Sequence, residues 1–564
     1  MVLRNYFWIV VVVPKLEVSK RDLEYLVGKS FTLGQLENVL EFVKGEVDFL
    51  EGDVLRIDCK ESNRPDLWST EGIAREIRAR LGIEKGIKKY EVHNGGVSVF
   101  VDANLSKIRP LISCAIVKGV TVTNDFIKQI VQLQEKVGEG YGRKRRELGI
   151  GLYDFDMMKP PVYYKGFRDY EIEFIPLEWK VRMRPSEILL QHDKGRAYKH
   201  LLEGHDLYPI VIDSAGTVAS MPPIINSQTT GKITLNTKNI FIECTGFKWA
   251  TVEAALEVIC MALADRGGKI YSCRVHFPKE STPYPAKVIN TPSFLVEKIS
   301  FNKELVIKKT GLKLTDKQMV DLLSKARFNA KIKDEKVHVE YASYRTDILH
   351  PVDLIEDLLI SYGFNNITPQ MVEMSVVGGE NFDSRFVDFV RDGCVGLGLQ
   401  EVLTYNLTSK KIQGENMLLG VLDFVELANP VSTNYEILRK HLAPQLLDFL
   451  SKNKDKEFPQ KVFEVGSVLS IDSREANGVK QTNNVCVALT HSSVNYTEAK
   501  SHLDSLCSYL GAKHSVKRKQ FPFFNENSAE IIIGSKKGFI GEVRREVIEA
   551  FGLRKPVCLF EFEL

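Results

Sequence analysis

The chain has 564 residues, more than one hydrophobic core usually serves, which predicts about three to five domains. Its hydrophobic fraction of 44% and charged fraction of 26% are those of an ordinary soluble globular protein. A net charge of +3 is close to balance, so the overall charge commits the chain neither to nucleic acid nor to a membrane. Local patches must therefore decide what it binds.

The nine cysteines are scattered along the chain and form no C-x-x-C pair. We therefore expect neither a zinc site nor a disulfide framework, and we expect the protein to reside in the reducing cytoplasm. Residues 1–13 are rich in apolar side chains, but they are too few to span a bilayer, and no small-residue cleavage site precedes Pro14. We expect no membrane partner. Whether residues 1–13 belong to the natural protein stays open.

The patterning indicates an α+β multidomain protein, and the first predicted unit, residues 14–88, is a small α+β domain. Ser19 followed by Asp22 predicts the start of a helix, and Gly28 predicts its end. A half-buried strand is expected over residues 53–58, where apolar and polar residues alternate.

The second predicted unit covers residues 89–280 and is dominated by strands. Strands are expected at 97–102, 111–122, 208–213 and 240–246, and helices at 125–135 and 252–265.

Two segments of this unit predict a polar pocket. The loop that begins at Ser220 is preset in an extended form by two prolines and projects polar side chains, among them Asn226. The apolar strand at 240–246 carries one internal carboxylate, Glu243, with Thr245 on the same face because side chains alternate along a strand. The alternative, that Glu243 points to solvent, stays open on the sequence alone.

A concentrated basic run lies in the same unit, and its four cations are Arg143, Lys144, Arg145 and Arg146. Such a run suits an RNA backbone, and it suits a solvated charged edge equally well. His192 lies further along, in a segment rich in Lys and Arg, and we expect it at the surface.

An acidic helix is expected in a third unit, residues 288–368. Pro351 suits the first helical position and Gly363 the stop. The acids are Asp353, Glu356 and Asp357, which stack on one helix face, and Asp347, one loop upstream. Two partners offset their repulsion: the helix macrodipole, worth about 0.3–1 kcal/mol per acid, or a Mg²⁺ ion, which prefers oxygen ligands. Spacing by itself favours the macrodipole.

The last predicted unit, residues 370–564, reads as an antiparallel sheet covered by helices. Helices are expected at 382–399 and 441–452, and strands at 402–406, 461–466, 530–534, 539–543 and 557–562. No phosphate-binding loop, zinc-protease motif or nucleophile elbow occurs anywhere in the chain.

Several long motifs in register resemble the β chain of phenylalanyl-tRNA synthetase, in its shorter archaeal and eukaryotic form. They are NRPDLWSTEGIAR from Asn63, GRKRR from Gly142, SMPPIIN from Ser220, ADRGGKI from Ala264, the acidic helix and GLQEVLTYNLT from Gly398. Their order and spacing match from about Pro14 to Leu564, which is nearly the whole chain.

The resemblance implies an (αβ)₂ heterotetramer that attaches phenylalanine to tRNA(Phe), with ATP bound by the α chain and no aminoacylation site in this chain. It implies four parts: the N-terminal domain, a B3/B4-like editing domain at 89–280, a B5-type domain at 288–368, and a class II synthetase-like fold at 370–564 that lacks catalytic motifs. It assigns Mg²⁺ to Asp347, Asp353, Glu356 and Asp357. It also assigns hydrolysis of mischarged Tyr-tRNA to a pocket containing Val211, Ser220, Glu243 and Thr245.

Two other hypotheses stay open. One is a non-catalytic RNA-binding scaffold subunit with a degenerate pocket. The other is a metal-dependent phosphoryl-transfer enzyme that uses the acidic cluster, although no phosphate-cradling loop accompanies those acids.

Overall fold

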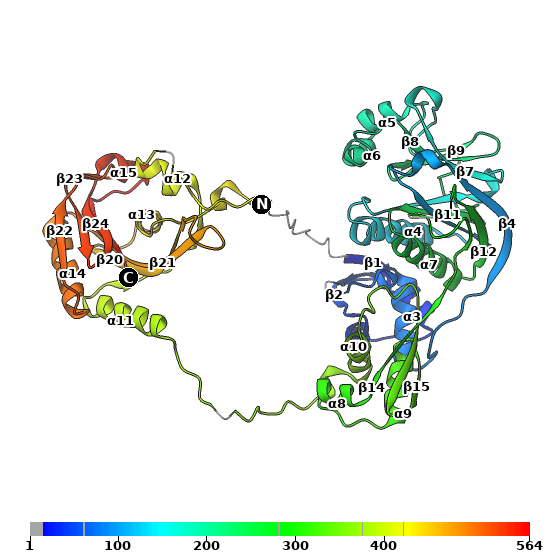
Figure 1. Ribbon diagram of the computed structural model, residues 1–564, viewed down its shortest axis with the longest axis horizontal. Helices are drawn as coiled ribbons and strands as arrows, with labels where there is room; N and C mark the ends of the chain where they lie inside the picture. The colour runs from blue at the N-terminus through cyan, green and yellow to red at the C-terminus, as the bar shows by residue number, and fades with distance from the viewer. Residues whose placement is uncertain (1–14, 60–61, 280–282, 375, 421) are drawn as a thin grey trace. The chain divides into compact units, whose positions relative to one another are not determined.

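The computed structural model describes residues 15–59, 62–279, 283–374, 376–420 and 422–564 (Figure 1). The chain forms two compact units, Met1–Gln370 (unit 1) and Met371–Leu564 (unit 2). Within the described ranges, no helix combines the length and the apolar character needed to cross a bilayer.

Unit 1 begins with a small three-stranded sheet and three helices. Its three-stranded antiparallel sheet has the order β1-β3-β2, from β1 Lys15–Ser19, β2 Glu46–Glu51 and β3 Val54–Asp58. The helices are α1 Lys20–Val27, α2 Leu33–Leu40 and α3 Thr70–Arg80. The Ser19 side chain accepts a hydrogen bond from the backbone N–H of Asp22, and Gly28 ends α1 with φ 79°, as the sequence predicts.

A ten-stranded mixed sheet follows, with the order β10-β9-β8-β7-β4-β12-β5-β11-β6 and β13 paired with β12. The strands are β4 Val92–Val101, β5 Leu111–Lys118, β6 Leu148–Asp154, β7 Val162–Phe167, β8 Tyr208–Asp213, β9 Val218–Met221, β10 Ile225–Asn226, β11 Asn239–Gly246, β12 Lys269–His276 and β13 Val288–Thr291. The helices are α4 Asn124–Lys136, α5 Pro185–Gln191, α6 Asp193–Tyr198 and α7 Trp249–Asp265.

The strand register of this sheet decides on which of its two faces the Glu243 side chain lies. Ser113 of β5 donates a hydrogen bond to Glu253 of α7, so Ser113 faces that helix. Its neighbour Cys114 pairs with Glu243 across the β5–β11 ladder. Because successive side chains alternate between faces, Glu243 lies on the face opposite α7.

The third part of unit 1 carries the acidic helix. A three-stranded sheet has the order β14-β16-β15, from β14 Val296–Asn302, β15 Asn329–Lys333 and β16 Lys336–Ala342. It is covered by α8 Glu304–Thr310, α9 Asp316–Lys325 and α10 Pro351–Tyr362. The predicted bounds of α10 are confirmed, because Pro351 opens it and Gly363, with φ 89°, follows its last residue.

Unit 2 is a seven-stranded sheet with the order β17-β20-β21-β25-β24-β23-β22. Its strands are β17 Gln400–Glu401, β20 Gln460–Ile471, β21 Val479–Thr490, β22 His514–Arg518, β23 Phe524–Ile533, β24 Lys536–Val543 and β25 Val557–Glu563, antiparallel except for β17 beside β20. The main helices are α11 Phe382–Gly396, α13 Ala443–Lys452 and α14 Tyr496–Tyr509; shorter elements are α12 Lys410–Gln413, α15 Arg545–Ala550, β18 Leu407–Thr408 and β19 Ile437–Leu438.

One prediction in unit 2 is wrong. The sequence predicts a strand over residues 402–406, but β17 ends at Glu401. The reason is a competing partner: the hydroxyl of Thr404 donates to the Glu464 carboxylate at 2.7 Å, and its N–H donates to the same group at 3.3 Å.

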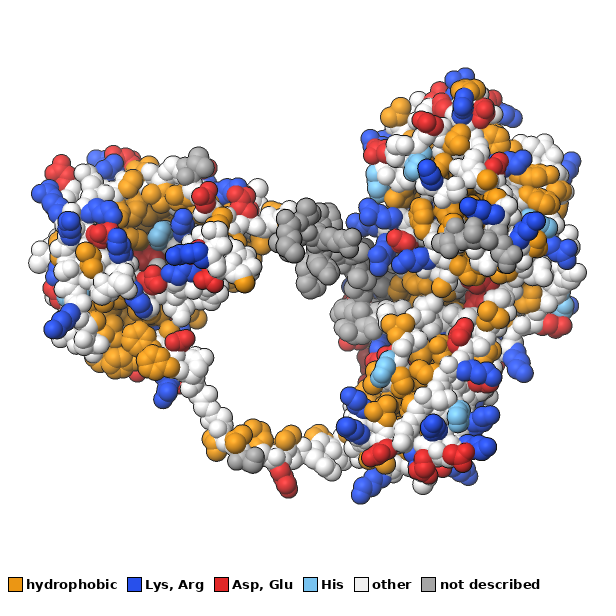
Figure 2. Space-filling view, viewed as in Figure 1, with side chains coloured by type: hydrophobic (Ala, Val, Ile, Leu, Met, Phe, Trp, Pro, Cys, Tyr) orange, Lys and Arg blue, Asp and Glu red, His pale blue; other side chains and the backbone are white. Residues whose placement is uncertain are grey.

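Helix α11 of unit 2 exposes hydrophobic side chains. Figure 2 shows them gathered over this helix, and Phe382 at its start is 73% exposed.

Candidate functional site

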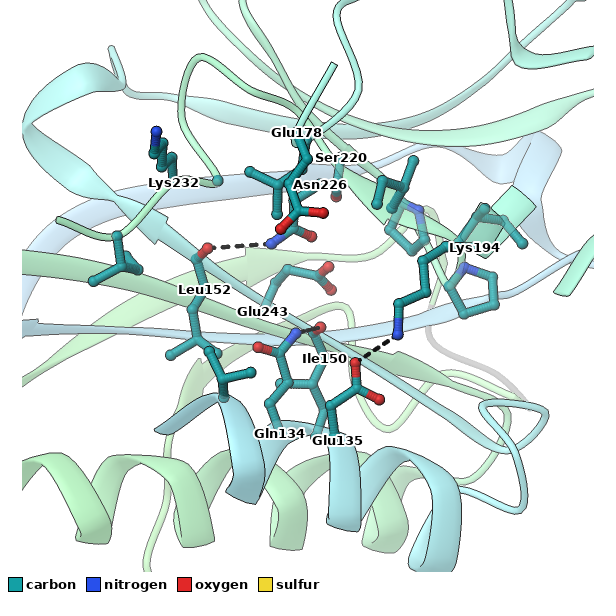
Figure 3. Close-up of a pocket in the computed structure, with 18 of the residues that line it drawn as sticks. Gln134, Glu135, Ile150, Leu152, Glu178, Lys194, Ser220, Asn226, Lys232 and Glu243 are labelled. Atoms are coloured by element: carbon teal, nitrogen blue, oxygen red, sulfur yellow. Dashed lines mark hydrogen bonds and ion pairs between the residues drawn. The ribbon is translucent and has the colours of Figure 1, made fainter. Parts of the chain in front are cut away.

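The most clearly built site of unit 1 is a cavity of about 340 Å³ beside the ten-stranded sheet (Figure 3). Its walls come from α4, β6, the β9–β10 segment, α6 and β11, so residues far apart in the sequence meet there. The loop after Ser220, with a cis bond between Pro222 and Pro223, closes one side. A cavity of this volume suits a small organic group such as an amino-acid residue.

Glu243 is the buried charge of the cavity, since the residue is only 2% exposed. The Tyr153 hydroxyl on β6 donates a hydrogen bond to its Oε1 at 2.9 Å, while its Oε2 is buried with no hydrogen-bond partner. Burial raises the pKa of Glu243 to about 7, against the weaker opposing effects of Tyr153, Arg109 and Ser220. The cavity therefore offers one unpaired carboxyl oxygen to a ligand.

Ser220 lies on β9 and is 1% exposed. Its hydroxyl lies close to Tyr153 and Glu243, where it opposes the rise in pKa that burial causes in both groups, but it forms no hydrogen bond of good geometry with either. Buried polar atoms without partners are costly in a folded protein. Two such atoms in one cavity, the Ser220 Oγ and the Glu243 Oε2, point to a polar ligand.

Two residues assigned to the pocket by resemblance do not line this cavity. The hydroxyl of Thr245 accepts a hydrogen bond from Nε of Arg109 at 2.9 Å, and its carbonyl accepts another at 2.7 Å, so Thr245 is held by a buried arginine. Val211 pairs with Ser220 across the β8–β9 ladder and is fully buried in the core. Only Ser220 and Glu243 of the four line the cavity.

The basic run divides between two roles. The Arg145 guanidinium donates to the carbonyls of Pro223 and Ile224 and stacks on Tyr198, so it holds the proline loop in place. Its neighbours Arg143, Lys144 and Arg146 are exposed. Three of the four predicted RNA contacts are thus available, and Arg145 is not.

Sequence reasoning missed several cavity residues. His192, expected at the surface, is 5% exposed and lines the cavity; its ring caps α6 and contacts the Leu177 carbonyl, which is why it is buried. Lys194 pairs with Glu135 at 2.8 Å on the opposite wall. No local pattern marks these residues, because their meeting depends on where α4 and α6 pack.

The acidic cluster lies around a separate cavity of about 60 Å³, which is also lined by Lys44, Arg64 and Arg345. The Arg345 guanidinium contacts Asp347 at 2.7 Å and Asp357 at 2.6 Å. Burial by itself would raise the pKa of both carboxyls, but the adjacent Arg345 charge holds both below their usual range.

The other two acids also have protein partners. Glu356 pairs with Lys44 at 2.6 Å, and the Asp353 carboxylate accepts the backbone N–H groups of Leu349 and His350 at the start of α10. Among the described residues, no three His, Cys, Asp or Glu side chains are arranged to hold a metal ion. The cluster in this arrangement does not fit Mg²⁺, because Arg345, Lys44 and two backbone N–H groups already contact the four carboxylates. The magnesium assignment stays a prediction.

The comparisons with known proteins first define a class. Residues 299–364 match the family described as tRNA synthetase B5 domain, and residues 367–564 match the family described as phenylalanyl tRNA synthetase beta chain CLM domain. The chain is therefore an α+β multidomain subunit of the aminoacyl-tRNA synthetase class, with a B5 domain where the acidic helix lies.

The relatives are more specific. The chain is 43% identical to the phenylalanine–tRNA ligase beta subunit of Thermococcus sibiricus over 559 residues, covering 98% of each chain, and 43% identical to that of Pyrococcus horikoshii, covering 98% of this chain and 99% of the relative. A crystal structure of an N-terminal fragment of the P. horikoshii β-subunit superposes with a TM-score of 0.59 and 44% identity, covering 62% of this chain and 100% of the fragment. The chain belongs to the phenylalanine–tRNA ligase β-subunit family, and the resemblance in the sequence is confirmed.

Proposed function

We propose that this chain acts with an α chain in attaching phenylalanine to its tRNA with ATP, and that its own cavity hydrolyses mischarged Tyr-tRNA. The observation that carries the editing proposal is the unpaired Glu243 oxygen beside the unpaired Ser220 hydroxyl. The exposed apolar face of α11 in unit 2 supports association with an α chain. In this proposal residues 89–280 are the editing domain and the cytoplasm is the compartment.

Discrimination between a tyrosyl and a phenylalanyl group follows from the carboxyl group of Glu243. A tyrosine hydroxyl that enters the cavity donates to the free Oε2 of Glu243, which also favours the ionised carboxylate. Phenylalanine leaves that oxygen buried and unpaired. A site built to hydrogen-bond a hydroxyl rejects the analogue lacking it by about 10⁴–10⁵-fold, so correctly charged Phe-tRNA is spared.

Hydrolysis itself needs no protein nucleophile in this proposal. Water positioned by the bound substrate and by nearby donors attacks the ester, while the residues of this chain select and orient the tyrosyl group. Tyr153 fixes the Glu243 side chain through its hydrogen bond, and Arg145 fixes the proline loop that closes the cavity.

The test is hydrolysis of preformed Tyr-tRNA by the complex of this chain with its α chain. Glu243→Ala should abolish it, whereas Glu203→Ala, at an exposed carboxylate of the same unit, should leave it intact. Undiminished hydrolysis by Glu243→Ala would move the site elsewhere. Absence of hydrolysis by the unaltered complex would favour the scaffold hypothesis.

The basic run supplies a second test, of RNA contact. Lys144→Ala removes an exposed cation and should weaken tRNA binding without changing the rate at saturating Tyr-tRNA. Arg145→Ala releases the proline loop and should lower that saturated rate. Equal effects of the two substitutions on both quantities would contradict the division of roles.

A further inference from the structure

Two amide side chains of the cavity bond to the edge strand of the sheet. β6 is the last strand in the sheet order, so one row of its backbone groups has no strand partner. Gln134 of α4 donates from Nε2 to the Ile150 carbonyl at 2.7 Å, and Asn226 of β10 donates from Nδ2 to the Leu152 carbonyl at 3.3 Å (Figure 3). Both amide side chains line the cavity.

The partner of each amide decides which way the group points. A backbone carbonyl can only accept a hydrogen bond, so the branch of the amide that faces it is the NH₂ group. The other branch is the oxygen, and neither Oε1 of Gln134 nor Oδ1 of Asn226 accepts a hydrogen bond from a described residue. Neither oxygen is fully buried, so a bound group can reach both.

The cations that line the cavity already have acidic partners or are exposed. Lys194 and Arg145 both contact Glu135, at 2.8 Å and 3.2 Å. Lys232 and Glu178 are exposed and carry opposite charges. The lining cations therefore give little opposition to a positively charged group beside the two amide oxygens.

A primary ammonium group matches these oxygens. It carries three N–H donors and no acceptor, whereas a carboxylate brings only acceptors. A tyrosyl ester has one ammonium group, on its α carbon, at the opposite end of the side chain from the phenolic hydroxyl. With the hydroxyl at the unpaired oxygens of Glu243 and Ser220, the ammonium is the remaining donor group of the ester.

We propose that the Gln134 Oε1 and the Asn226 Oδ1 bind the α-ammonium group of the ester, so that the cavity acts on esters with a free α-amino group. The inference rests on the proposed function, because it concerns the ester that the cavity hydrolyses. Acylation of the nitrogen removes its charge and leaves a single N–H donor, so an ester of a blocked amino acid or a peptide is a poor substrate.

The test compares two tRNA esters with the complex of this chain and its α chain. Tyr-tRNA carries the ammonium group, and 3-(4-hydroxyphenyl)propionyl-tRNA is the same ester without it. Each rate is divided by the spontaneous hydrolysis rate of that ester, because the ammonium group itself makes an ester more reactive. The enhancement for Tyr-tRNA should be larger by about 10-fold or more, the effect of a hydrogen bond to a charged group.

Gln134→Leu and Asn226→Leu remove the amide oxygens. Each should lower the enhancement for Tyr-tRNA by about 10-fold or more and leave that for the ester without the ammonium group unchanged. A loss of cavity shape would lower both. Gln132→Leu is the matched control and should change neither, since Gln132 lies on the same helix and donates to the Glu17 carbonyl but does not line the cavity.

Three results would overturn the proposal. They are equal enhancement of the two esters by the unaltered complex, an equal loss for both esters in the leucine variants, and unchanged Tyr-tRNA hydrolysis in those variants.

A binding measurement separates this inference from the proposed function. If the unaltered complex hydrolyses neither ester, the proposed function fails, and calorimetric titration of the full-length chain decides the inference. L-tyrosinamide, at about pH 6 where its amine is protonated, should then bind about 10-fold more tightly than 3-(4-hydroxyphenyl)propionamide, and Gln134→Leu should remove the difference. Equal binding of the two amides would overturn the ammonium site as well.

Discussion

The buried carboxyl of Glu243 makes a prediction that links the cavity to stability. Glu243→Gln keeps the shape of the side chain and removes its charge. The folded pKa of the wild-type group is raised from 4.5 to about 7, so between these values the unfolded chain ionises while the folded one does not. Stability of wild type therefore falls as pH rises through this window and levels off above it. One pKa unit is worth about 1.36 kcal/mol.

The expected result is a pH-dependent difference. The free energy of unfolding of Glu243→Gln, relative to wild type, should increase by about 2–3 kcal/mol between about pH 5 and about pH 8.5. All four tryptophans of the chain, at positions 8, 68, 179 and 249, precede unit 2. Urea unfolding followed by tryptophan fluorescence thus reports on unit 1.

Glu203→Gln, at an exposed carboxylate, is the control and should show no such trend. A Glu243→Gln difference that stays constant with pH would refute the reasoning. It would mean that Glu243 titrates as in water, and that the cavity does not present a desolvated carboxyl to tyrosine.

Three further experiments test the polar contacts of unit 1. Arg345→Ala removes the arginine partner of Asp347 and one of the two arginine partners of Asp357, whose other partner is Arg80, and should destabilise unit 1 by about 3–5 kcal/mol. Lys44→Ala breaks a solvent-exposed ion pair and should cost under about 1 kcal/mol. Equal costs in urea unfolding would contradict the described pairing. The double variant Asp353→Ala/Glu356→Ala should leave the Mg²⁺ content of the isolated chain unchanged in elemental analysis, and loss of a bound ion would instead support the magnesium assignment. Arg109→Ala should cost about 1–3 kcal/mol for each buried acceptor it leaves unpaired, and a neutral result in the same unfolding assay would argue that water replaces the guanidinium.

Features set by near neighbours were predictable from the sequence. The Ser19 cap and the Gly28 stop of α1, and the Pro351 start of α10, depend on groups within about four residues, so their residue types alone specify them. The family resemblance also predicts that Ser220 and Glu243 share one pocket, because the motifs of a family include residues that its common fold brings together.

Only the tertiary structure decided which groups those side chains meet. Tyr153 reaches Glu243 because β6 pairs with β11, and Asp357 meets Arg80 across 277 residues of chain, contacts that no local pattern encodes. The same packing buried His192 and brought Arg145, predicted as a possible RNA contact, against the carbonyls of the proline loop. The sequence by itself determined the elements, the acids and the family; the fold decided their partners, because strand register and helix packing depend on the whole core at once.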